Sequence, residues 1–252
     1  MCSGALDVRF GSTSRKNIER EAQRLRAMGL EEGQHFTVKM PKGGKAGYVY
    51  IRREGLAYAA WLSVNGSGDQ QRLAAEFIEY ILQRAEEACG GAEHCAVYEK
   101  AEEIIEEGKA WGSLTLKGFE KKVEVNGKTY VVKVLDGGAE IEKSRGGKKL
   151  LRIKITAEVD GVRREYEITY GRYGKNEAKG FAYASANAPG GREADAERLA
   201  AVIEALTGVK PKIRRRSDST IEIICGREHL EGFKRYAELA NAIMKWLKET
   251  SQ

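Results

Sequence analysis

Apolar residues recur at helical spacing in several parts of the chain. Leu73, Phe77, Ile81 and Ala85 share one face of a helix over residues 69–88, and such a stripe is typical of an amphipathic helix that packs on a core. Similar spacing and flanking signals predict four further helices, at residues 14–28, 93–107, 195–206 and 228–248.

Strand-like alternation is the other recurring pattern. A strand-rich run follows the first helix, with turn signals at Lys42-Gly43-Gly44 and Arg53-Glu54-Gly55. After residue 114, alternating runs are joined by Asn126-Gly127 and by Asp160-Gly161, pairs that favour the type I′ turn of a β-hairpin. These patterns predict an α+β protein in which antiparallel β-hairpins or meanders pack with amphipathic helices.

The change from helix-rich to strand-rich sequence near residues 108–113 predicts two domains. Residues 1–110 are expected to form an α/β unit that contains the helices 69–88 and 93–107. Residues 111–252 are expected to form a β-rich unit that ends in a helix–hairpin–helix arrangement.

Two sequence words occur twice in the same order. Gly55-Leu-Ala-Tyr-Ala-Ala precedes Asp69-Gln-Gln-Arg-Leu-Ala-Ala, and Gly180-Phe-Ala-Tyr-Ala-Ser precedes Asp195-Ala-Glu-Arg-Leu-Ala-Ala. We therefore expect a duplicated strand–loop–helix unit, and hence two related halves about a pseudo-two-fold axis.

The densest cluster of positive charge lies in the range 209–224, where an Asp/Ser turn joins two runs with strand-like alternation. The first run places four cations on one face and adds a fifth: Lys210, Lys212, Arg214, Arg216 and Arg215. Because each Lys or Arg can neutralise a phosphate, such a hairpin suits a polyanion. The alternative is a solvated edge strand, where cations protect against aggregation.

Further cations extend this hypothesis. Arg145, Lys148 and Lys149 fall in a loop between the two predicted hairpins, and Arg172 is flanked by Tyr170 and Tyr173. These cations can add phosphate contacts, and the tyrosines can stack on bases. The tyrosines are equally well explained as cross-strand packing.

The composition is compatible with nucleic-acid binding and argues against a membrane protein. The chain has 43 Lys and Arg against 37 Asp and Glu, a net charge of +6, which is compatible with polyanion binding. Scarce Asn and Gln beside abundant Glu, Lys and Arg are typical of hyperthermophile proteins. No signal peptide is recognisable, and no apolar run approaches the ~18 residues of a membrane span. We therefore expect a cytoplasmic protein with no membrane partner.

The cysteines leave three readings open. Cys89 and Cys95 flank a short Gly-containing segment and can be free thiols or a disulfide, or can join His94 in a metal site. The spacing matches no zinc pattern and a fourth ligand is missing, so no cofactor or metal is predicted.

Asp69 and Asp195 occupy equivalent places in the repeated words. They can be read as a pair of metal-binding carboxylates, as in two-metal nucleases. A position at a helix N-terminus, capping free N–H groups, accounts for both with fewer assumptions. We therefore predict that both cap helices, and we assign no catalytic residue.

Three long words resemble a known family. They are Gly112-Ser-Leu-Thr-Leu-Lys-Gly-Phe119, Ala188-Pro-Gly-Gly-Arg-Glu-Ala-Asp-Ala-Glu-Arg-Leu-Ala-Ala201 and His229-Leu-Glu-Gly-Phe-Lys-Arg-Tyr-Ala-Glu-Leu239. The chain, from Gly55 through Leu82 and from Ser113 onward, resembles the paralogous-repeat protein family, type 2b, first noted in Pyrobaculum. The resemblance implies a crenarchaeal hyperthermophile and brings no activity with it.

A more distant likeness concerns residues 195–248, which are similar to part of a LAGLIDADG homing-endonuclease half. That family's β-saddle lies on DNA, and its acidic residue follows a signature helix. The nearest segments here, 56–64 and 181–186, end at Asn65 and Asn187 and have the pattern of strands. The likeness therefore implies DNA binding more directly than cleavage.

The sequence thus predicts a non-enzymatic, basic protein that binds DNA or RNA, mainly through phosphates. One alternative is a LAGLIDADG-like endonuclease that uses Asp69 and Asp195 with Mg²⁺. Another is a protein-binding scaffold or homodimer, in which the Glu-rich helix 99–107 and the Lys-rich β region form opposite-signed docking surfaces.

Overall fold

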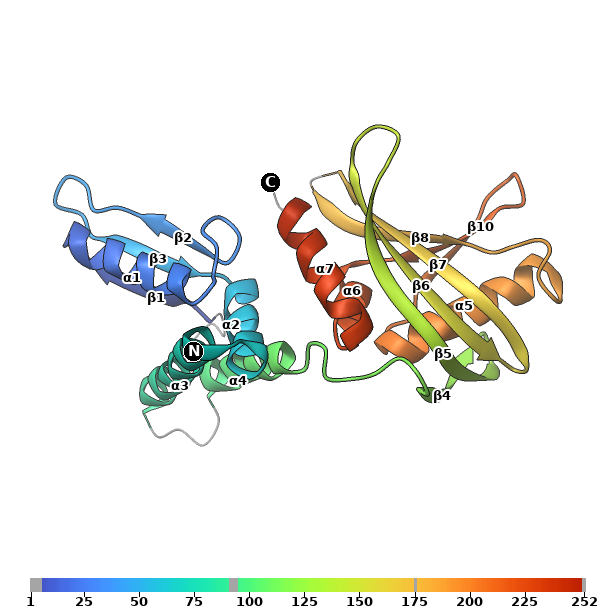
Figure 1. Ribbon diagram of the computed structural model, residues 1–252, viewed down its shortest axis with the longest axis horizontal. Coiled ribbons are helices and arrows are strands. Elements are labelled where there is room, and N and C mark those ends of the chain that lie inside the picture. The colour runs from blue at the N-terminus through green and yellow to red at the C-terminus, as the bar shows by residue number, and fades with distance from the viewer. Residues whose placement is uncertain (1–5, 91–94, 175, 251–252) are drawn as a thin grey trace. The chain divides into compact units, whose positions relative to one another are not determined.

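The computed structural model describes residues 6–90, 95–174 and 176–250. The chain divides into two compact units, Met1–Ala110 and Trp111–Gln252, which we call unit 1 and unit 2 (Figure 1). In the described residues, no helix has both the length and the apolar character needed to cross a membrane.

Unit 1 combines a small antiparallel sheet, of strand order β1-β3-β2, with four described helices. Helix α1 packs on the sheet, and α2 packs against both α3 and α4. The elements are β1 (Val8–Ser12), α1 (Arg15–Ala27), β2 (Phe36–Lys39), β3 (Gly47–Ile51), α2 (Arg53–Asn65), α3 (Gly68–Cys89) and α4 (Ala96–Lys109).

Local signals account for the two most regular of these helices. Ser14 begins α1, and its hydroxyl accepts a hydrogen bond from the Asn17 backbone N–H at 3.4 Å, as a helix N-cap does. Helix α3 buries Phe77, Ile81 and Ala85, as its apolar stripe predicts. It ends at Cys89 because Gly90 takes a left-handed conformation, with φ of 58°, which glycine adopts without steric penalty.

Helix α2 corrects the expectation that 56–64 is a strand. Its Gly55 passes so close to β2 that a Cβ there would lie 2.2 Å from the His35 carbonyl oxygen. A Cβ on Gly108 of α4 would lie 2.0 Å from the Ala57 carbonyl oxygen. Since α2 is enclosed from several sides, its apolar residues follow no single stripe, and the helical period is hidden.

The same helix removes the support for an internal duplication. Gly55 to Ala60 are helical, whereas the matching word from Gly180 to Tyr183 lies in a strand, β8 (Glu177–Tyr183). The two copies therefore adopt different structures, and the duplicated unit is not shown.

Unit 2 is built on a curled antiparallel sheet whose described strands number seven, in the order β4-β5-β6-β7-β8-β10-β9. Helices α5, α6 and α7 pack on one face of it (Figure 1). With β8, the elements are β4 (Glu120–Val125), β5 (Lys128–Lys143), β6 (Lys149–Val159), β7 (Val162–Tyr173), α5 (Gly191–Thr207), β9 (Lys212–Arg215), β10 (Ile221–Cys225), α6 (Arg227–Phe233) and α7 (Ala237–Thr250).

Both predicted hairpin turns are confirmed. The φ angles are 52° and 78° at Asn126 and Gly127, and 50° and 79° at Asp160 and Gly161. A type I′ turn requires positive φ at both central residues, and its twist matches that of the flanking strands. These turns set the register of β4 with β5 and of β6 with β7.

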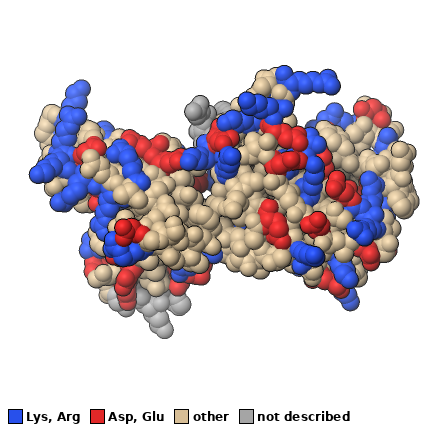
Figure 2. Space-filling view, viewed as in Figure 1, with Lys and Arg blue, Asp and Glu red and all other residues tan. Residues whose placement is uncertain are grey.

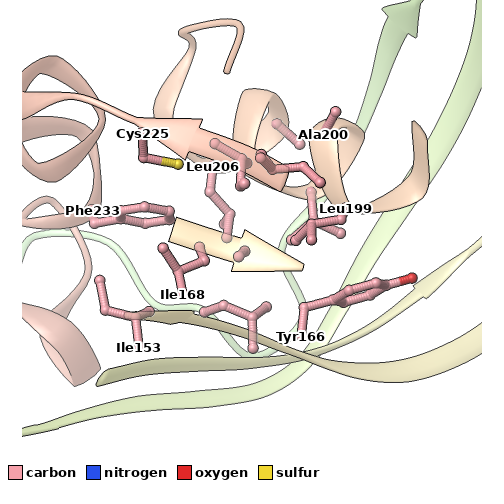
Figure 3. Packing of buried hydrophobic residues seen from close by; sticks show 14 of the residues in the cluster. Ile153, Tyr166, Ile168, Leu199, Ala200, Leu206, Cys225 and Phe233 are labelled. Atoms are coloured by element: carbon pink, nitrogen blue, oxygen red, sulfur yellow. The ribbon is translucent and has the colours of Figure 1, made fainter. Parts of the chain in front are cut away.

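The core of unit 2 lies between the sheet and its helices. Ile153 and Ile168 from the strands meet Leu199 and Leu206 of α5 and Phe233 of α6 (Figure 3). Alternate residues of β6 are buried, and those between them are partly exposed, as the period of a strand dictates. The sheet thus has an inner face against the helices and an outer face toward solvent.

Candidate nucleic-acid interface

The basic hairpin predicted at 209–224 is present as β9 and β10. They pair antiparallel, with Lys212 opposite Ile224 and Arg214 opposite Glu222. The turn is closed by Asp218, whose carboxylate accepts a hydrogen bond from the Thr220 backbone N–H at 2.9 Å. Ile221 and Ile223 enter the core, so Glu222 belongs to the outer face.

Glu222 is the unexpected centre of this hairpin, because its side chain is 0% exposed. Arg214 donates to its Oε2 from Nε at 2.7 Å and also from Nη2, and Arg216 forms an ion pair with Oε1. Burial by itself raises the pKa of Glu222, but the hydrogen bonds and charges of the two arginines outweigh it, so the pKa lies below its ordinary value. Two half-exposed guanidinium groups are thereby held on one covered carboxylate.

The remaining hairpin cations are held differently. Arg215 donates to Glu193 of α5, with contacts of 3.0 and 2.7 Å. Lys210 precedes β9, and its Nζ lies 3.9 Å from Glu204. Lys212 is exposed and has no ion pair within the described part of the chain. The expected row of four equivalent cations is therefore replaced by one open lysine and several arginines already paired with carboxylates.

Aromatic side chains continue the outer face beside these cations. Tyr183 of β8 stands opposite Glu222 and is 58% exposed, and Phe181 stands opposite Ile224. Tyr173 of β7 is 44% exposed, and its ring meets that of Phe181 edge-on at 5.3 Å. Burial and then the charge of Glu222 raise the pKa of Tyr183, so its hydroxyl stays neutral.

A glycine allows this arrangement. A Cβ on Gly171 would lie 3.0 Å from the Tyr173 ring, so the ring reaches across a position without a side chain. We call the resulting surface the arginine–tyrosine face; its members are Tyr173, Phe181, Tyr183, Lys212, Arg214 and Arg216. Tyr173 and the cations are predicted from the sequence, whereas Phe181, Tyr183 and the role of Glu222 are not, although the strand pattern at 181–186 is a signal for the aromatic pair.

Two other candidates lie elsewhere. Tyr170 is fully buried and meets Trp246 of α7 at 6.4 Å, so the reading as cross-strand and core packing holds. Arg172 lies 4.9 Å from the Trp246 ring and donates to the Thr250 hydroxyl at 3.0 Å. Burial, followed by the charge of Arg227, lowers the pKa of Arg172. It faces α7 rather than the outer face.

The turn between β5 and β6 carries a separate group. Arg145 and Lys148 are exposed there, while Lys149 pairs with Glu249 at 3.1 Å. Strands β7, β8 and β10 separate β6 from β9 in the sheet. These cations therefore stand apart from Lys212, Arg214 and Arg216, although β6 is next to the strand that carries Tyr173.

The two aspartates are not equivalent. Asp69 is in the first turn of α3, where it complements the helix dipole, but it makes no capping hydrogen bond, and its side chain is 89% exposed beside Arg72. Asp195 lies beyond the first turn of α5 and is 2% exposed. It accepts hydrogen bonds from Arg164 at 2.8 Å and the Ser185 backbone N–H at 2.7 Å. The capping prediction is therefore wrong for Asp195 and only partly met by Asp69.

The two cysteines considered as metal ligands are bonded to each other. Cys89 and Cys95 form a disulfide, and His94 lies outside the described residues. Within the described ranges, no group of three or more His, Cys, Asp or Glu side chains is arranged to hold a metal ion.

Charge is divided unequally between the units. Unit 2 contains 28 Lys and Arg against 20 Asp and Glu, a net charge of +8, whereas unit 1 contains 15 against 17, a net charge of −2. The positive excess of the chain therefore resides in the unit that carries the arginine–tyrosine face. Cations and anions nevertheless alternate over much of the surface in view (Figure 2), so local placement matters more than the total.

The chain was compared with known protein families, curated proteins and solved structures. The model of the PaRep2b protein family matches residues 15–251. The chain belongs to this family. PaRep2b is an archaeal paralogous-repeat family, as the three long words suggested. No curated protein and no solved structure matches the chain.

The likeness to LAGLIDADG endonucleases is not shown by these comparisons. The segment closest to that family's signature helix is indeed helical, as α2, but it ends at Asn65. An amide stands where the resemblance requires a carboxylate.

Proposed function

We propose that this PaRep2b protein binds nucleic acid, without catalysis, on the arginine–tyrosine face of unit 2. The observation that carries the proposal is the pair of exposed rings, Tyr173 and Tyr183, on the same outer face as Lys212, Arg214 and Arg216. A groove or surface that combines cations with stacking rings is typical of proteins that bind single strands.

The carboxylate of Glu222 has a definite part in this proposal. It occupies Nε and Nη2 of Arg214 and leaves Nη1 of that side chain for another acceptor. A guanidinium that is already oriented loses less conformational entropy when it binds a phosphate. Glu222 thus positions the arginines, at the expense of one unit of positive charge.

In this proposal the lysine and the tyrosines of the face contact different parts of the nucleic acid. Lys212 supplies a mobile point charge for the backbone, because it has no ion pair within the described residues. Tyr183 and Tyr173 offer ring surface to unpaired bases, whose stacking on aromatic side chains contributes about 1–3 kcal/mol per base. DNA and RNA both present these groups, and phosphate contacts carry most of the affinity.

The test replaces one cation and one aromatic residue of the face and compares this variant with a control in which a lysine and a tyrosine are replaced elsewhere on the surface. The variant is Lys212→Ala with Tyr183→Ala, since neither side chain belongs to the core. The control is Lys121→Ala with Tyr80→Ala, an exposed lysine on β4 and an exposed tyrosine on α3. Fluorescence anisotropy measures the affinity for mixed-sequence oligonucleotides, as single-stranded DNA, single-stranded RNA and duplex, at several salt concentrations.

We expect the face variant to weaken single-strand binding by roughly tenfold or more, the loss of one stacked base. Its log–log salt dependence should flatten by ~0.7 for the lost phosphate contact. The control should bind as the unmodified protein does. Equal affinities for face variant and control, or no binding by the unmodified protein, would remove the proposal.

A further inference from the structure

The small sheet of unit 1 also has an open face. Helix α1 covers the side where Phe36, Val49 and Ile51 are buried. The alternate residues point the other way, and none of them is buried. They are Arg9, Gly11, Thr37, Lys39, Tyr48 and Tyr50.

Strand register places two rings at the centre of this face. Tyr48 and Tyr50 are alternate residues of β3, the middle strand. Arg9 and Thr37 flank Tyr50, and Gly11 and Lys39 flank Tyr48. Because Gly11 has no side chain, the β1 side of Tyr48 is open to the side chain of Arg9, two residues away on the same strand. The rings are therefore bordered by two cations and one small hydroxyl.

The cations lie over the rings themselves. The Arg9 guanidinium carbon is 4.8 Å from the centre of the Tyr48 ring and 5.7 Å from that of Tyr50. The Lys39 ammonium is 5.7 Å from the Tyr48 ring. Arg9 also pairs with Asp7 at 3.0 Å, and both side chains are about half exposed. Cation–π contacts at exposed sites are weak, so an incoming base competes readily for the rings.

Charge selects the kind of ligand that this face accepts. Residues 6–53, which include α1 and all three strands, hold 11 Lys and Arg against 5 Asp and Glu, a net charge of +6. Residues 54–110, nearly all of α2 to α4, hold 4 against 12, a net charge of −8. Figure 2 shows Lys and Arg gathered over the part of unit 1 that contains α1 and the sheet. At long range, a polyanion is attracted to the part of unit 1 formed by α1 and the sheet and is repelled by α2 to α4.

The turn between β2 and β3 adds two cations at the end of the sheet where Lys39 and Tyr48 lie. Lys42 and Lys45 exchange backbone hydrogen bonds of 3.3 and 3.1 Å across Gly43 and Gly44, whose φ angles are 58° and 76°. This tight turn adjoins the ends of the strands that carry Lys39 and Tyr48. Both lysines are exposed and can contact the backbone of a strand lying over Tyr48.

We propose that this face of unit 1 is a second nucleic-acid site, and that it takes single-stranded polynucleotide. Bases stack on Tyr48 and Tyr50, and Arg9, Lys39, Lys42 and Lys45 contact phosphates. Two residues along a strand rise about 6.7 Å, roughly twice the 3.4 Å between stacked bases of a duplex. An extended, unstacked strand therefore places one base on each ring, whereas the bases of a duplex are already stacked on one another.

The proposal goes beyond the face of unit 2, and one experiment separates them. The full chain is irradiated with a single-stranded oligonucleotide that carries photoreactive uracil, as RNA and as DNA, and is then cleaved with trypsin. Cleavage at Lys and Arg releases residues 46–52 with both unit 1 tyrosines, and residues 180–192 with Tyr183. Cross-links are expected on 46–52. Cross-links on 180–192 alone would overturn the unit 1 site and leave the proposed function standing, and cross-links on 46–52 alone would do the reverse.

Affinity gives an independent readout. Tyr48→Thr with Tyr50→Thr places β-branched residues, which favour strands, at both positions and removes both rings, and Tyr80→Thr on α3 is the control. In the Lys212→Ala, Tyr183→Ala background, the double variant should lose about tenfold or more in single-strand affinity. Arg9→Ala with Lys39→Ala, which leaves the core untouched, should flatten the salt dependence by ~1.4, or ~0.7 for each phosphate.

An acidic peptide is the competing occupant, and polyglutamate serves as its probe. Because polyglutamate has no bases, stacking predicts that ring removal lowers oligonucleotide affinity and leaves polyglutamate affinity unchanged. Equal losses for both probes, or no loss for either in a folded double variant, would overturn the proposal.

Discussion

The two sheets of this chain hold their solvent-facing cations by different interactions. In unit 2, Arg214 and Arg216 share the covered carboxylate of Glu222. In unit 1, Arg9 and Lys39 lie over the rings of Tyr48 and Tyr50. A covered carboxylate depends on its partners, since a charge away from water needs compensation. The partly exposed rings of Tyr48 and Tyr50 carry no charge and need no such compensation. We therefore expect the arginines on Glu222 to contribute to the stability of unit 2, and the cations over the tyrosine rings to contribute little to the stability of unit 1.

Of the variants considered, Arg214→Ala with Arg216→Ala should lower the stability of the chain most. Glu222 then remains on the sheet without either partner. We expect the free energy of unfolding of unit 2 to fall by about 2 kcal/mol, below the usual value for a broken buried pair because the cluster lies at the surface. Hydrogen exchange at the β10 amides measures the change. Unchanged protection of the β10 amides would mean that the covered carboxylate does not depend on the two arginines.

The units also differ in their covalent reinforcement. Unit 1 carries the Cys89–Cys95 disulfide between α3 and α4, while Cys225 of unit 2 is a buried free thiol whose pKa burial raises to about 12. Cys89→Ala with Cys95→Ala should lower the stability of unit 1 by about 2 kcal/mol, since the bridge closes a short loop. Calorimetry should show the unit 1 transition moving to lower temperature and the unit 2 transition staying in place. A shift of both transitions would contradict this assignment.

The response to acid of Glu222 with its two arginines is a smaller effect. The pKa of Glu222 is lower in the folded protein than its ordinary value of about 4.5. Its contribution to stability is therefore fully present above that value and is lost as the pH falls through the folded pKa. Glu222→Gln should cost unit 2 about 1 kcal/mol at pH 7, and the difference should vanish in acid. Denaturant titrations at pH 7 and near pH 2 compare the two proteins; a difference independent of pH would point to packing instead.

The smallest expected change in stability is in unit 1. Arg9→Ala with Lys39→Ala removes two exposed side chains, so the free energy of unfolding should stay within about 0.5 kcal/mol. Thermal unfolding followed by circular dichroism is sufficient to check this. A loss comparable to that of the unit 2 arginine pair would mean that both sheets depend equally on their cations.

Several elements of this chain follow from short-range signals. Ser14 and the stripe of Ile18, Ala22 and Leu25 predict α1, and Gly90 marks the end of α3. The turn residues and alternating pattern locate the β9–β10 hairpin. Each of these signals acts within a few residues, through capping, φ preference or the period of a helix or strand.

Other features have no local signal. Helix α2 lacks a single apolar stripe because several neighbours enclose it, and its word Gly-x-Ala-Tyr-Ala is a strand when the neighbours differ, as in β8. Asp195 is engaged by Arg164, from a strand distant in sequence. The strand period places Tyr170 and Tyr173, three residues apart, on opposite faces, but only the packing of α7 against Tyr170 decides which of the two is buried.

The sequence by itself determined the antiparallel α+β class, the hairpin turns, the family and the concentration of cations at 209–224. Only the tertiary structure decided which of those cations remain open, because pairing depends on carboxylates that distant strands and helices bring alongside. Glu193 reaches Arg215 from α5, and Glu222 is covered only when β10 lies between β8 and β9. Charge is a property of residues, but its availability to a ligand is a property of their neighbours in space.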